Sequence, residues 1–287
     1  MQWERGAWSP DGRRIAFTAS YGAVDPDWDI WVIRADGTGR RRLTSDGASS
    51  HPVWSPDGMR IYFAYRPEDH PKQVEFSDGS DADPAWIQSM RPDGSDRREV
   101  TSPVAGQFEI PGSFSPDGRT LTLTRGEYRE LGPRGRVGDV YEVWAMGPDG
   151  SEARKLVERA RDPAFSPDGR RIAYASDRDE NGALSYGDAA YYAYELYVMH
   201  AEGSSPRRLT HTRGLNEVQP AWMPGSSRIA YQRGWDYQSA QVTTVLQANA
   251  DGSCPRPVFA DAGIETWYGA PAWRPGDART GDGPLRC

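Results

Sequence analysis

Short apolar runs bounded by turn residues fill almost the whole chain. Examples are "RIAFTA" at 14–19, "RIAYAS" at 171–176 and "ELYVMH" at 195–200. Such runs, rich in aromatic and β-branched residues and closed by Gly, Pro and Asp, are typical of β-strands. No segment carries a long 3.6-residue apolar period with helix caps. The pattern therefore predicts an all-β protein.

The strands recur as one repeated unit. An aromatic residue ends the first strand of each copy, and the turn "SPDG" follows it in four copies. Pro presets the first central turn position, and Gly takes the left-handed conformation that closes the hairpin. The aromatic positions lie roughly 50 residues apart, a period typical of repeat folds. They are Trp8, Trp54, Phe114, Phe165, Trp222 and Trp273.

Each unit reads as a four-stranded antiparallel meander. After "SPDG" come a second strand, a variable loop, a third strand, a Gly turn such as "PDGS", and a short fourth strand such as "RRLT". One small sheet cannot bury both faces, but a ring of such sheets can, which predicts a β-propeller. The expected blades of this single domain (1–287) are 6–44, 51–101, 109–157, 161–210, 217–259 and an incomplete sixth at 267–287.

Composition excludes some classes of function. The net charge is −7 and Arg is spread along the chain, so the basic stripe of a nucleic-acid-binding protein is absent. No apolar run approaches the ~20 residues of a membrane helix, so no membrane insertion is expected. The first residues do not read as a signal peptide. The two cysteines, Cys254 and Cys287, either pair or remain free thiols.

The repeated text resembles the TolB-type, WD40-like PD40 propeller family. The resemblance rests on "AWSPDGRRIAF", on "ELYVMHAEG" and on the terminal "RRLT". It implies a propeller, usually six-bladed, that works as a protein-binding part of envelope assemblies in a periplasmic or extracellular setting. A cytoplasmic location stays open. This chain departs from the pattern after Trp273, where "RPGD" replaces the turn. Besides an incomplete sixth blade, two alternatives therefore stay open: a five-bladed ring with an extra strand, and a fragment of a larger protein.

Functional residues are expected on the rim that carries the variable loops. These loops are 66–84, 125–139, 177–192 and 233–241, and function concentrates in loops held by a rigid scaffold. The mouth of the central channel and the aromatic loops supply a candidate contact set for a protein partner or a glycan. That set is His51, Glu109, Arg161, Asp162, Gln219, Trp235, Tyr237, Trp267 and Tyr268. The alternative is that the residues at the mouth only hydrate the channel and satisfy strand ends.

The stretch "DRDENGALSYGD" at 177–188 resembles a calcium-binding loop. Its acidic and amide positions, Gly at the sixth place and carboxylate at the twelfth fit the oxygen ligands that calcium prefers. The candidate ligands are Asp177, Asp179, Asn181, the carbonyl of Ala183, and Asp188. Asp in place of Glu at the last position weakens the match, and an ordinary enlarged turn explains the same text.

Motifs for catalysis are absent from the sequence. It has no G-x-S-x-G, H-E-x-x-H, C-x-x-C or nucleotide-binding loop. The main hypothesis is therefore a non-catalytic binding module. The alternative is a carbohydrate-active enzyme on the same scaffold. Glu109 and Asp162 would be the carboxyl pair of a glycoside hydrolase. By resemblance to oligogalacturonate lyases, His51, His211 and Gln219 would converge on a metal ion.

Overall fold

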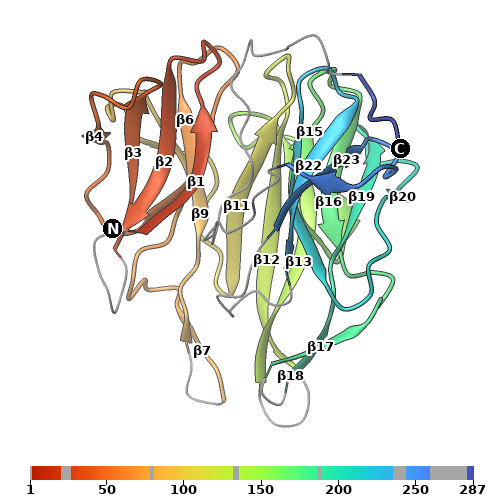
Figure 1. Cartoon of the computed structure of the whole chain (residues 1–287). Coiled ribbons are helices and arrows are strands. Elements are labelled where there is room, and N and C mark those ends of the chain that lie inside the picture. Colours follow the sequence, from red (N-terminus) through yellow and green to blue (C-terminus); the bar gives the residue numbers. More distant parts are fainter. Residues whose placement is uncertain are drawn as a thin grey trace.

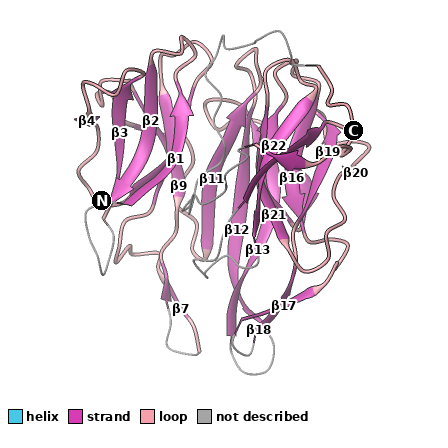
Figure 2. Cartoon of the chain, in the orientation of Figure 1, coloured by secondary structure: helices cyan, strands magenta, loops and turns pink. Residues whose placement is uncertain are grey.

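The computed structural model describes residues 2–20, 27–77, 81–131, 136–186, 189–234, 244–258 and 283–287. These residues form strands, turns and loops only, as Figure 2 shows. Five four-stranded antiparallel sheets make the blades of a β-propeller (Figure 1). The predicted all-β propeller is confirmed. Within the described part, no helix is long and apolar enough to cross a membrane.

The strands follow one order in every blade, with two hairpins inserted. Blade 1 contains β1 (Gln2–Trp8), β2 (Arg14–Ser20), β3 (Trp28–Arg34) and β4 (Arg41–Arg42). Blade 2 contains β5 (Ser49–Trp54), β6 (Ile61–Tyr65), β9 (Trp86–Met90) and β10 (Arg98–Glu99). Blade 3 contains β11 (Gln107–Phe114), β12 (Leu121–Leu131), β13 (Arg136–Met146) and β14 (Arg154–Glu158). Blade 4 contains β15 (Ala160–Phe165), β16 (Arg171–Ser176), β19 (Glu195–His200) and β20 (Arg207–Arg208). Blade 5 contains β21 (Asn216–Trp222), β22 (Arg228–Gly234), β23 (Thr244–Asn249) and β24 (Arg256–Pro257).

The variable connections extend from one side of the ring. Hairpin β7–β8 (Val74–Glu75 and Asp81–Ala82) follows β6, and hairpin β17–β18 (Ala183–Tyr186 and Ala189–Tyr192) follows β16. Figure 1 shows both hairpins and the far ends of β12 and β13 reaching beyond the blades at the bottom of the view. We call this side the wide rim. The segment 125–139, expected as a loop, is mostly an extension of the β12–β13 ladder.

The "SPDG" turns close the first hairpin of blades 1 to 4 on the opposite rim. In blade 1 the Gly12 N–H donates to the Ser9 carbonyl at 2.8 Å, and Gly12 has a φ of 64°. The Ser9 hydroxyl donates to Asp11 at 2.6 Å and thereby lowers the pKa of that carboxyl. The turn prediction is confirmed, and the turn is satisfied by its own residues.

The apolar core is divided among the contacts between blades. Four clusters of buried side chains each draw on two consecutive blades. Two of the repeat aromatics also form hydrogen bonds between consecutive blades. Trp54 Nε1 donates to the Ala7 carbonyl, and Trp222 Nε1 donates to the Ala164 carbonyl, each at 3.0 Å. At the outer turn of blade 5, a Cβ on Gly252 would lie 2.2 Å from the carbonyl oxygen of Leu209 in blade 4. Blades therefore stabilise one another rather than folding alone.

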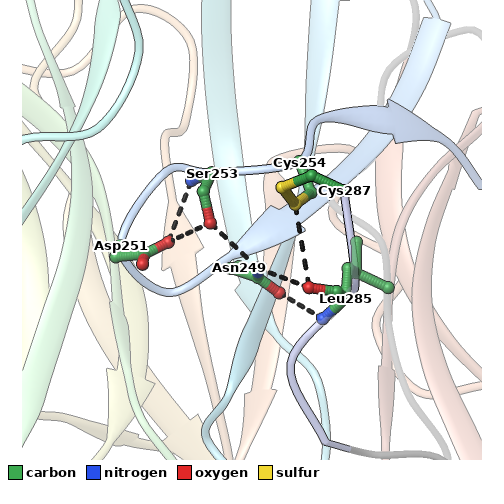
Figure 3. The surroundings of a disulfide bond; sticks show 6 residues. All are labelled: Asn249, Asp251, Ser253, Cys254, Leu285 and Cys287. Carbon is green, nitrogen blue, oxygen red and sulfur yellow. Dashed lines mark hydrogen bonds between the residues drawn. A yellow bond between two sulfur atoms is a disulfide. The ribbon is translucent and has the colours of Figure 1, made fainter.

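A disulfide fastens the C-terminal residues to blade 5. Cys254 and Cys287 are bonded, with their Cα atoms 5.1 Å apart. Figure 3 shows Leu285 beside Asn249, and the two exchange hydrogen bonds of 2.5 and 3.0 Å. Of the two alternatives for the cysteines, the structure shows the pair. The expected sixth blade falls largely in 259–282, outside the described residues.

Candidate binding site

The first strand of each blade is interrupted by a register shift. In blades 2, 4 and 5 the shift contains a left-handed residue that precedes a proline: His51, Asp162 and Gln219, with φ of 57°, 54° and 54°. A residue before proline disfavours the right-handed helical conformation, and residues other than Gly rarely adopt a positive φ. The neighbouring blade holds two of these positions. The His51 N–H donates to the Thr18 hydroxyl and the Asp162 N–H to that of Thr124, each at 3.0 Å.

Three of the predicted contact residues therefore occupy matching, strained positions in the first strands of their blades. Strain of this kind persists only where surrounding structure enforces it, and it occurs often at binding and catalytic sites. A sequence pattern marks the positions, since each residue stands directly before the proline of its first strand. The register shift itself appears only in the fold.

A cavity of about 380 Å³ runs along the channel axis and is lined by residues of all five first strands. Its walls are mainly small residues, prolines and the repeat aromatics, with Asp162 and Gln219 among the polar members. Gln219 is only 6% exposed. Within the described residues, its side-chain oxygen has no hydrogen-bond partner. The channel is thus a narrow, largely apolar space with few polar groups.

A larger cleft of about 550 Å³, the mouth cleft, opens between blades 1, 2 and 3. It contains four carboxylate side chains but only one Arg and one His. Its lining residues are Asp27, Trp28, Asp46, Gly47, Ala48, Ser50, His51, Ala64, Arg66, Pro67, Glu68, Asp83, Ala85 and Ile110.

The charged groups of the mouth cleft differ in their partners. Asp46 pairs with Arg97, and Asp83 accepts the His70 N–H at 3.0 Å. In the described part of the chain, Asp27 and Glu68 have no ion-pair partner. Both are exposed. Asp27 and Glu68 are therefore the carboxylates of the cleft that remain available to a ligand.

Arginine side chains lie against aromatic rings at two places, one in the mouth cleft and one in blade 4. The Arg66 guanidinium is 5.8 Å from the ring centres of Phe108 and Tyr128. Arg161, which is buried, lies 4.9 Å from the Tyr141 ring and 5.8 Å from that of Tyr194. Cation–π contacts of this kind hold a guanidinium in place without neutralising its charge. The sequence analysis included Arg161 but missed Arg66, which stands where β6 ends and the long loop begins.

The carboxyl pair considered for hydrolysis is engaged in structural contacts. Glu109 accepts from Arg125 at 2.9 and 2.7 Å and from the Thr101 hydroxyl. Asp162 accepts from Arg161 at 3.2 Å and is 9% exposed. A general acid or a nucleophile must reach the substrate. Buried carboxylates held by arginine are poorly suited to that role.

The residues considered for a lyase metal are also separated. His51 lines the mouth cleft and Gln219 the channel, whereas His211 is exposed and lines neither. Trp235, Tyr237, Trp267 and Tyr268 lie outside the described residues.

The side chains expected to bind calcium contact several different partners. Asp177 accepts from Arg159 at 3.1 Å, and Asp179 from Arg208 at 3.0 Å. The Asn181 amide donates to Glu195. Ala183 begins β17, and Asp188 lies outside the described residues. The described part holds no group of three His, Cys, Asp or Glu side chains arranged for a metal ion. Calcium binding stays a prediction.

The described residues define a β-propeller of five four-stranded blades. No protein-family model matches the chain. It is 27% identical over 198 residues to the uncharacterized peptidase YuxL of Bacillus subtilis. This match covers 67% of this chain and 23% of YuxL. It is 56% identical over 50 residues to the Tol-Pal system protein TolB of Anaeromyxobacter dehalogenans, 17% of this chain and 11% of TolB.

A solved structure agrees with this fold over almost the whole chain. A protein identified provisionally as TolB from Agrobacterium tumefaciens superposes with a TM-score of 0.68 at 18% identity. The match covers 96% of this chain and 86% of that one. The chain spans less than a quarter of the length of the two curated relatives above. The similarity therefore identifies the propeller, while the activities of those longer proteins belong to their whole chains.

Proposed function

We propose that this chain is a non-catalytic binding module that takes up a segment of a protein partner in the mouth cleft. The observation that carries the proposal is the cleft itself, about 550 Å³ and open on the wide rim. Within the described residues, its carboxylates Asp27 and Glu68 are left without ion pairs. Unpaired charges beside an immobilised guanidinium provide directional contacts for an incoming chain.

Two further observations support a protein partner. The similarity to TolB, a Tol-Pal system protein, favours assembly with other proteins. The inserted hairpins and the extended β12–β13 ladder project from the wide rim (Figure 1) and enlarge the surface for contact beyond what a small ligand needs. The disulfide fits a periplasmic or extracellular location, because such bonds persist in oxidising compartments.

The test selects ligands without assuming one. Wild-type chain is used to enrich a random linear peptide library displayed on phage and is applied to a printed glycan array. Glu68→Arg reverses one charge of the cleft, and Glu202→Arg is the matched control on the opposite rim, where Glu202 is exposed. We expect enriched peptides to lose at least about tenfold in affinity on Glu68→Arg and to keep it on Glu202→Arg.

Two results would contradict the proposal. Peptides that bind both variants equally would place recognition elsewhere. Selective retention of a glycan, with cleavage on incubation with that glycan, would favour the carbohydrate-active alternative.

A further inference from the structure

The contact between blades 4 and 5, here called seam 4/5, buries two carboxyl groups together. Glu195 on β19 is 1% exposed and Glu217 on β21 is fully buried. The side chain of Glu195 lies within hydrogen-bonding reach of Glu217. The Glu217 N–H also donates to the Tyr194 carbonyl at 2.8 Å, which fixes the two strands at this point. Two carboxyl groups are therefore held in contact away from water.

The hydrogen-bond donors around this pair are one hydrogen short. Glu195 accepts from Arg208 at 2.8 Å and from the Asn181 amide through Oε1, and from the Thr210 hydroxyl at 2.7 Å through Oε2. Glu217 Oε1 accepts from Arg233 at 2.7 Å. Among the described residues, Glu217 Oε2 has no partner. The Thr210 hydroxyl also lies within reach of Glu217, but it has a single hydrogen, and its 2.7 Å hydrogen bond is to Glu195. Two carboxylate oxygens cannot hydrogen-bond each other unless one of them carries a proton.

The charged groups that face the pair do not remove this shortage. Arg208 comes from β20 and Arg233 from β22, while Asp179, from the loop after β16, accepts from Arg208 at 3.0 Å. Three carboxyls thus share two guanidinium groups. Burial raises the pKa of Glu217 to about 7; the Thr210 hydroxyl and Arg233 lower it, but the neighbouring Glu195 acts in the same direction as burial.

We propose that Glu195 and Glu217 form a proton-binding site that controls the closure of seam 4/5. With a proton bound, the two carboxyls share a hydrogen bond and the blades close on each other. When the proton leaves, two like charges face each other in a buried site and the seam loosens. The Tyr194 carbonyl, bound to the Glu217 N–H, links the seam to the first strand of blade 4, because the Tyr194 ring lies 5.8 Å from Arg161.

The sign of the effect follows from the raised pKa. The folded chain holds this proton more tightly than the unfolded chain, so its contribution to stability is complete below pH about 4.5. The contribution is lost as the pH rises through about 7. The seam is therefore expected to be tight in mildly acidic solution and weaker above neutrality.

The experiment measures the melting temperature between pH 5 and 8.5 for wild type, Glu217→Gln and the control Glu109→Gln. In the control, the replaced carboxyl occupies the same position in blade 3 but has an arginine and a threonine as donors. Glutamine at 217 supplies the missing hydrogen at every pH. We expect wild type to lose at least about 3 °C relative to Glu217→Gln across this range, and Glu109→Gln to keep the wild-type slope.

Histidine titration is common to all three proteins and cancels in the difference. An unchanged pH slope in Glu217→Gln would overturn the proposal. Should that variant fail to fold, hydrogen exchange of the wild-type chain gives a second test. Protection of the Glu217 amide, corrected for intrinsic exchange, is expected to fall at least about tenfold from pH 6 to pH 8, and constant protection would contradict the proposal. Neither readout involves the mouth cleft, so failure here leaves the proposed binding function standing.

Discussion

Two contacts between blades each bury a glutamate at the same register position, but the two glutamates have different hydrogen-bond partners. Seam 2/3 joins blades 2 and 3, and seam 4/5 joins blades 4 and 5. Glu109 of β11 pairs across the ladder with Arg125, and Glu217 of β21 pairs with Arg233. Both glutamates are buried at their seams. Arginine partners are therefore common to the two sites.

The difference comes from the third strand of the preceding blade. Where seam 4/5 has Glu195, the matching register position in blade 2 is Trp86. The threonine hydroxyl of seam 2/3, from Thr101, is thus donated to Glu109, whereas that of Thr210 goes to Glu195. One exchange of an apolar for an acidic residue leaves Glu217 short of a donor. Blades with the same backbone fold can therefore differ in electrostatics. The residue on the third strand determines which carboxylate accepts the hydrogen bond of the threonine hydroxyl.

The largest expected effect is on stability, from removing the Cys254–Cys287 disulfide next to seam 4/5. The double change Cys254→Ser and Cys287→Ser removes the bond that closes a 33-residue separation. Releasing such a loop is expected to lower the free energy of unfolding by about 3–4 kcal/mol. Urea unfolding followed by tryptophan fluorescence measures it. Reduced wild type should match the variant, and a loss below about 1 kcal/mol would show that the tail adds little constraint.

The next effect separates the two seams directly. Arg125→Met leaves Glu109 buried with one remaining donor, and breaking a buried ion pair is expected to cost about 3 kcal/mol. Arg233→Met at seam 4/5 should cost less at pH 5 than at pH 8, because a proton can neutralise Glu217. Urea unfolding of both variants at the two pH values checks this. Equal pH dependence at the two seams would remove the distinction between them.

The smallest expected effect concerns calcium. The loop proposed to bind it also supplies Asn181 to Glu195 and Asp179 to Arg208. Calcium must displace these contacts, so millimolar calcium should raise the melting temperature of wild type by less than about 2 °C relative to EDTA. Asp177→Asn provides the control. A larger rise that Asp177→Asn abolishes would establish the calcium site and connect it to seam 4/5.

Much of the fold was predictable because its signals are local. The "SPDG" turn needs only its own serine, aspartate and glycine, so each copy specifies a hairpin without help from distant residues. The candidate site was predicted in part. His51, Asp162 and Gln219 stand before prolines, a visible signal. Arg66 and Glu68 follow β6 of blade 2, whereas Asp27 precedes β3 of blade 1, and their approach to one cleft depends on how the ring places the two blades.

The sequence by itself determined the strands, their turns and the repeated blade, since hydrophobic alternation and turn chemistry act over a few residues. The tertiary structure alone decided which carboxylates are free and which are held. Glu109 looked like a catalytic candidate until Arg125 and Thr101 were seen around it. Nothing in the sequence marks Glu195 and Glu217 as a pair. The physical reason is that charge and hydrogen-bond balance depend on every neighbour in space, and those neighbours come from other strands of the same blade and of the adjacent blade.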